Sequence, residues 1–89
     1  MEDNTFGNSL VNVIKFLFDN KGKWITDDEI TNIAPQYGDK IIEKLIANDA
    51  VITTKDGILF DDDCFEALKR YLTSIGININ LFHYKCEIL

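Results

Sequence analysis

The sequence predicts a small α+β domain. Three observations lead to this prediction: a capped apolar pattern of helical period before Pro35, a second such pattern after Gly38, and two β-prone runs around Asp56-Gly57. We therefore expect two helices joined by a turn and followed by a β-hairpin, with a further amphipathic helix on each side. The 89 residues suffice for one such domain, and the 46% of hydrophobic residues suffice for its core.

Residues 9–19 predict the first helix, because their apolar side chains recur with the spacing of one buried helical face. Asn8 or Ser9 is a suitable residue to cap its start. Residues 23–25 then predict a short extended segment, which would pair with the hairpin and make the sheet three-stranded. A lone tryptophan just before a capped helix usually packs beneath it, so we expect Trp24 in the core.

Residues 27–34 predict the second helix. Thr26 and Glu29 have the spacing of a capping box, in which each side chain accepts a hydrogen bond from the backbone amide of the other residue. Pro35 disfavours helical geometry at the residue before it, so the helix should end there. Residues 35–38 then form the turn to the next helix.

The third expected helix covers residues 37–48. Its hydrophobic residues follow the spacing i, i+1, i+4, i+5, which predicts a single buried stripe. The stripe consists of Ile41, Ile42, Leu45 and Ile46. Two polar rows lie beside it: Lys40 and Lys44 with Tyr37, and Asp39 with Glu43.

Residues 50–60 predict a β-hairpin. Two runs of β-prone residues surround Asp56-Gly57, and this dipeptide favours a two-residue hairpin loop. A loop at these two residues would place Thr54 opposite Leu59.

Residues 63–75 predict a fourth helix, with acids at its start and Gly76 just past its end. Its apolar face comprises Phe65, Leu68, Tyr71, Leu72 and Ile75. The C-terminal tail, residues 77–89, predicts an extended segment. Its alternating apolar pattern shifts by one residue, which indicates a bulge or a break between two short strands.

The order of helix, turn, helix and hairpin over residues 26–60 resembles the winged-helix superfamily. The resemblance lies in the segments ITDDEI, IIEKL and VITTKDGILF. It implies one winged-helix domain over residues 1–89, with a core of three helices, a sheet of two or three strands, and an added C-terminal helix and strand. In winged helices that bind DNA, the second helix of the pair enters the major groove, and the hairpin, called the wing, touches the backbone or the minor groove.

One hypothesis for the function is therefore a DNA-binding transcriptional regulator. It would bind double-stranded DNA and form a homodimer through residues 63–75 and the C-terminal tail. The contacts would come from the third helix, the turn before it and the hairpin loop. The candidate nucleic-acid-binding residues are Gln36, Tyr37, Lys40, Lys44, Asn48 and Lys55.

The charge distribution favours a second hypothesis. Fifteen acids and nine bases leave a net charge of −6, and the expected reading helix has no arginine, the residue that most often reads guanine. The alternative is an acidic protein–protein interaction module: an adaptor, a subunit or an inhibitor, including one that mimics nucleic acid. The candidate partner-binding residues are Asp61, Asp62, Asp63, Tyr84 and Ile88.

The sequence predicts no catalytic residue, no metal and no cofactor. His83, Cys86 and Cys64 are potential zinc ligands, but a fourth ligand has no candidate. The acids at residues 61–63 are not followed by the glycine and the glutamate that an EF-hand loop requires. We therefore expect a protein that is not an enzyme and whose cysteines are reduced.

No apolar run approaches the roughly 20 residues of a membrane-spanning helix. The first four residues are mostly polar and lack the features of a signal peptide. We therefore expect a cytoplasmic protein that does not contact a membrane.

Overall fold

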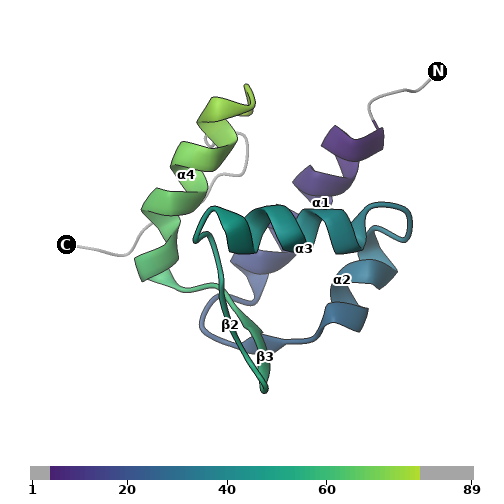
Figure 1. Cartoon of the computed structure of the whole chain (residues 1–89), viewed down its shortest axis with the longest axis vertical. Coiled ribbons are helices and arrows are strands. Elements are labelled where there is room, and N and C mark those ends of the chain that lie inside the picture. The colour runs from purple at the N-terminus through teal and green to yellow at the C-terminus, as the bar shows by residue number, and fades with distance from the viewer. Residues whose placement is uncertain (1–4, 79–89) are drawn as a thin grey trace.

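The computed structural model of the protein describes residues 5–78, which form helices and one antiparallel sheet (Figure 1). In chain order the elements are α1 (Thr5–Asp19), β1 (Trp24–Ile25), α2 (Asp27–Ile33), α3 (Gly38–Ala47), β2 (Ile52–Thr54), β3 (Gly57–Leu59), the 3₁₀ turn η1 (Asp62–Cys64) and α4 (Phe65–Ser74). The predicted α+β class is confirmed. Figure 1 shows α3 across the middle of the molecule, with the β2–β3 hairpin extending away from the helices.

Helix α1 begins at Thr5 and not at residue 9. The predicted cap at Asn8 or Ser9 is therefore wrong, because both residues lie inside the helix. The additional turn carries Phe6, whose ring packs edge-on against the ring of Tyr37 with the two centroids 5.6 Å apart. Because Tyr37 immediately precedes α3, this contact ties the start of α1 to the start of α3 and stabilises the additional turn.

Helices α2 and α3 form the predicted pair joined by a turn. The capping box is confirmed: the amide of Glu29 donates to Oγ1 of Thr26 at 3.2 Å, and the amide of Thr26 donates to Oε1 of Glu29 at 2.8 Å. Helix α2 ends at Ile33, two residues before Pro35. The ends of both helices lie within one residue of the expected bounds.

Gly38, the first residue of α3, allows α3 to approach α2 closely. A Cβ atom at this position would lie 2.7 Å from Cγ2 and 2.8 Å from Cα of Thr31. Carbon atoms that are not covalently bonded to each other do not approach so closely, so a larger residue would force the two helices apart.

The three strands pair in the order β1-β3-β2, so the predicted third strand joins the hairpin. The predicted hairpin loop, however, is wrong by one residue. Leu59 lies opposite Ile52 and not opposite Thr54, and Thr54 lies opposite Gly57. The loop therefore consists of Lys55 and Asp56.

Backbone geometry explains this difference. A loop at Asp56-Gly57 would require a positive φ at both residues, and Asp56 does not have one. The amide of Asp56 instead donates to Oγ1 of Thr54 at 3.0 Å, which closes the turn one residue earlier. Gly57 begins β3 with a φ of +128°, where a Cβ atom would collide with the carbonyl oxygen of Ile25 in β1.

The core lies between the helices and one face of the sheet. Ile25 and Ile58 are paired across β1 and β3, and both are buried. The fully buried side chains include Leu10, Ile14 and Leu17 of α1, Ile30 of α2, Ile41 and Leu45 of α3, Phe60 after β3, and Leu68 and Leu72 of α4.

The prediction that Trp24 lies in the core is wrong, because its side chain is 45% exposed. Neighbouring side chains of a strand point to opposite faces, and Ile25 occupies the inward position. Trp24, Leu59 and Ile52 are paired across the three strands and so form a row on the outer face of the sheet.

Helix α4 ends at Ser74, one residue before the expected end. The amides of Gly76 and Ile77 donate to the carbonyl oxygens of Thr73 and Leu72, and Gly76 has the positive φ, +84°, that such a helix end favours. Ile75 was expected on the buried face of this helix. It lies past the last helical residue and is exposed.

The predicted strands of the tail at residues 79–89 lie outside the described residues, and so do His83 and Cys86. Within residues 5–78, no helix has both the length and the apolar composition needed to cross a membrane.

Candidate functional site

Helix α3 exposes two flanks of opposite charge. Side chains three or four residues apart share one flank of a helix, so Asp39, Glu43 and Ile46 lie on one flank. Lys40 and Lys44 lie on the other flank, one turn apart. This separation agrees with the two polar rows expected from the sequence.

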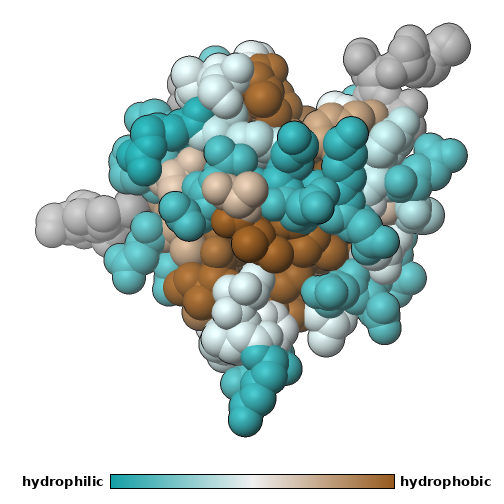
Figure 2. Space-filling model, in the orientation of Figure 1, coloured by the Kyte–Doolittle hydropathy of each residue, from teal (hydrophilic) through white to brown (hydrophobic). Residues whose placement is uncertain are grey.

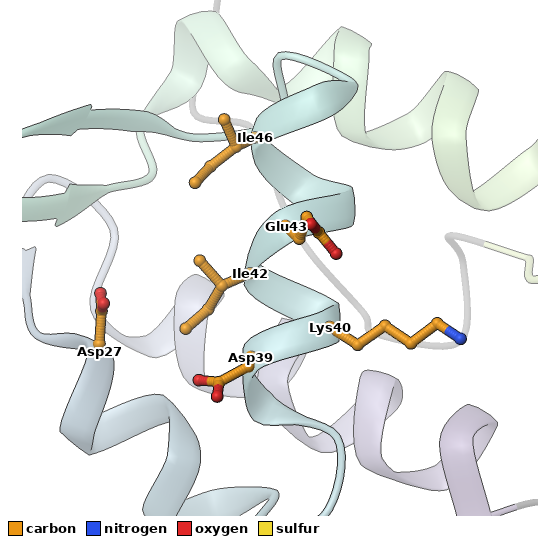
Figure 3. Close-up of a pocket in the computed structure, with 6 residues that line it drawn as sticks. All are labelled: Asp27, Asp39, Lys40, Ile42, Glu43 and Ile46. Carbon is orange, nitrogen blue, oxygen red and sulfur yellow. The ribbon is translucent and has the colours of Figure 1, made fainter.

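A groove of about 560 Å³ runs along the first flank of α3. We call it the acidic groove. It is lined by Asp27 of α2 and by Asp39, Lys40, Ile42, Glu43 and Ile46 of α3. Figure 3 shows Asp39, Ile42 and Ile46 on the side of α3 that faces Asp27, whereas the side chain of Lys40 extends to the opposite side.

Part of the wall of the acidic groove is hydrophobic. Ile42 is only 8% exposed, but Ile46 is 42% exposed, so Ile46 presents most of this apolar surface. Figure 2 shows hydrophobic side chains gathered between α3 and the β2–β3 hairpin. The prediction that Ile46 is buried is therefore wrong. The core covers only part of the predicted apolar stripe of α3. Ile46 lies at the edge of this stripe and remains exposed.

Carboxylates dominate the charge of the acidic groove. Its lining contains the three carboxylates of Asp27, Asp39 and Glu43 and one ammonium group, that of Lys40, which points away. Asp27 and Asp39 lie in the first turns of α2 and α3, where the positive end of each helix dipole stabilises a negative charge. The acidic groove thus combines accessible hydrophobic surface with a net negative charge.

A second, smaller hollow of about 290 Å³ lies on the other flank of α3. We call it the lysine hollow. It is lined by Phe6 of α1, by Lys40 and Lys44 of α3, and by Tyr71 and Ile75 at the C-terminal end of α4. Nζ of Lys40 lies 6.0 Å from the centroid of the Phe6 ring, a distance at which an ammonium group and an aromatic ring attract each other weakly.

Of the six predicted nucleic-acid-binding residues, Lys40 and Lys44 line a common hollow, the lysine hollow. The ring of Tyr37 packs on Phe6, and Nδ2 of Asn48 donates to the carbonyl oxygen of Lys44 at 2.8 Å, where it closes the end of α3. Gln36 is exposed in the turn before α3, and Lys55 is exposed in the hairpin loop. These four residues line neither the acidic groove nor the lysine hollow.

The predicted partner-binding acids make local contacts at the start of α4. Oδ1 of Asp61 accepts a hydrogen bond from the amide of Asp63 at 3.0 Å and so caps η1. Asp62 forms an ion pair with Lys21, with Nζ and Oδ1 2.9 Å apart. Tyr84 and Ile88, the other two candidates, lie outside the described residues. In the part of the chain that the structure describes, no cluster of side chains suitable for a metal ion is found.

The acidic groove was not predicted as a site. The helical spacing of α3 places Asp39 and Glu43 in one row, but it does not connect them with Asp27, which belongs to another helix. One local signal was the position of Ile46 at the edge of the apolar stripe of α3, where a side chain is more readily left exposed.

Comparisons of the chain with protein-family models, with curated proteins and with solved structures found no match.

Proposed function

We propose that the protein is a winged-helix module without enzymatic activity that binds another protein through the acidic groove. The winged-helix assignment is supported by the order of α1, β1, α2, α3 and the β2–β3 hairpin, and by the sheet order β1-β3-β2. The hairpin corresponds to the wing. In this fold, α3 and the wing form the usual binding surface.

The observation that carries the proposal is the position of Ile46. It is 42% exposed within a groove whose lining also contains Asp27, Asp39 and Glu43. Apolar surface that becomes buried on binding supplies affinity, whereas charges around it select the partner and orient it. The partner is therefore a protein segment that presents hydrophobic side chains together with lysine or arginine.

A DNA-binding role is the second candidate, and one observation favours it. Lys40 and Lys44 are exposed on the same flank of α3, and Lys55 is exposed at the tip of the hairpin. However, the two lysines of α3 line a hollow that is bordered by α1 and α4, and the opposite flank carries the carboxylates of the acidic groove. These carboxylates would repel the phosphates of DNA, so the arrangement supports a protein partner more strongly.

The test uses two labelled peptides with the same amphipathic pattern, one of leucine and lysine and one of leucine and glutamate. Fluorescence anisotropy measures the binding of each peptide to the full chain. We expect the cationic peptide to bind and the anionic peptide not to bind. The triple variant Asp27→Asn, Asp39→Asn, Glu43→Gln should weaken the binding of the cationic peptide by about tenfold or more.

A matched control variant distinguishes the effect of the groove carboxylates on binding from the effect of the net charge of the protein. The variant Asp19→Asn, Asp56→Asn, Glu66→Gln removes three exposed acids that do not line the groove, so it changes the net charge by the same amount. We expect it to retain nearly all of the binding. Equal losses in the two triple variants, or no binding of the cationic peptide, would contradict the proposal.

A further inference from the structure

The lysine hollow has the composition of a binding site for an amphiphilic anion. Its apolar lining comes from two separate helices, with Phe6 in α1 and Tyr71 and Ile75 at the end of α4. Tyr71 is buried, and Ile75 is among the exposed large hydrophobic residues. The hollow therefore offers aromatic and aliphatic surface to which a ligand has access.

The two positive charges of this site belong to exposed side chains, those of Lys40 and Lys44. Within residues 5–78, neither Lys40 nor Lys44 forms an ion pair with a carboxylate. The acids of α3, Asp39 and Glu43, line the acidic groove and not the lysine hollow. Two ammonium groups one helical turn apart thus lie beside an apolar hollow.

We propose that the lysine hollow binds a small organic carboxylate with an apolar body. The apolar body would lie against Phe6, Tyr71 and Ile75, and the carboxylate would lie between the ammonium groups of Lys40 and Lys44. The volume of about 290 Å³ is close to the lower end of small-molecule sites, which occupy about 300–1,000 Å³, and this favours a small ligand over a folded partner. The lysine hollow shares Lys40 with the acidic groove, but Lys44, Phe6, Tyr71 and Ile75 do not line that groove, so Lys44 tests the hollow separately.

The experiment uses octanoate as the probe, with acetate and octylammonium as comparison ligands. Binding is followed by chemical-shift changes of the ¹⁵N-labelled full chain. We expect saturable shifts around Phe6, Lys44 and Tyr71 with octanoate. Acetate lacks the apolar body, and octylammonium has the opposite charge, so neither should produce these shifts.

The variant Lys44→Glu should weaken octanoate binding by about tenfold, because it replaces an attractive charge with a repulsive one. Lys55→Glu makes the same change at the exposed hairpin loop and should leave the binding unchanged. Unfolding curves of both variants show whether the fold is retained. The proposal is overturned if octanoate produces no saturable shifts, if octylammonium binds equally well, or if a folded Lys44→Glu variant binds octanoate as tightly as the unaltered protein.

Discussion

Leu45 and Ile46 are neighbours in α3, yet the side chain of Leu45 is fully buried and that of Ile46 is 42% exposed. The boundary of the core therefore passes between two adjacent residues of this helix. This boundary places an isoleucine in the wall of the acidic groove, where part of its side chain remains in contact with solvent.

The two residues should consequently differ in their contributions to stability. Leu45→Ala removes a fully buried side chain and should lower the free energy of unfolding by about 2–5 kcal/mol. Ile46→Ala removes a side chain that remains in contact with water, so we expect a change within about 1 kcal/mol. Urea denaturation of both variants measures the difference. Similar losses would show that Ile46 belongs to the core.

Gly38 should be the least replaceable residue of the α2–α3 turn. Gly38→Ala places a Cβ atom 2.8 Å from Cα of Thr31, and a backbone atom cannot move aside as a side chain can. We expect a loss of about 1–3 kcal/mol in the free energy of unfolding.

Gly7→Ala is the matched control, because Gly7 also lies in a helix and a Cβ atom there meets no atom within 4 Å. This variant should be neutral or more stable by up to about 1 kcal/mol, since alanine favours helix formation. Equal effects of the two substitutions would contradict the close contact between α2 and α3.

Tyr71 should make the protein less stable at alkaline pH. Burial raises the pKa of its phenol above the ordinary value of 10.0. The unfolded chain therefore loses this proton at a lower pH than the folded chain, and stability falls as the pH rises from about 10 towards the higher pKa of the folded state. Below pH 10 the contribution is fully present.

The variant Tyr71→Phe removes this titration. Its free energy of unfolding, measured by denaturation between pH 8 and pH 11, should fall less steeply above pH 10 than that of the unaltered protein. Burial also raises the pKa of the Cys64 thiol from 9.0, so the decline that begins near pH 9 should remain in this variant. If the free energy of unfolding falls equally steeply in both proteins above pH 10, the titration of Tyr71 does not cause the loss of stability.

The parts of the fold that local signals determine could be predicted from the sequence. The capping box of Thr26 and Glu29 sets the start of α2, and Pro35 limits its end, so both bounds agree closely with the structure. Gly76 likewise marks the end of α4, where its positive φ accompanies the closing hydrogen bonds.

The features that depend on contacts between distant residues could not be predicted. The Asp56-Gly57 dipeptide did not reveal that Gly57 begins β3 and lies against the carbonyl oxygen of Ile25, which belongs to another strand. The earlier start of α1 depends on the contact between Phe6 and Tyr37. The acidic groove could not be predicted for the same reason, because Asp27 and Ile46 come to line one groove only after α2 and α3 have packed together.

We propose that the acidic groove binds a cationic, hydrophobic protein segment. The most direct measurement is a ¹⁵N NMR titration of the full chain, first with the leucine–lysine peptide and then, in a separate sample, with duplex DNA. We predict that the peptide produces saturable shifts at Asp27, Asp39, Glu43 and Ile46, and that DNA produces none at salt concentrations of about 150 mM. Peptide shifts that avoid these residues, or saturable DNA shifts centred on Lys40, Lys44 and Lys55, would contradict the proposed function.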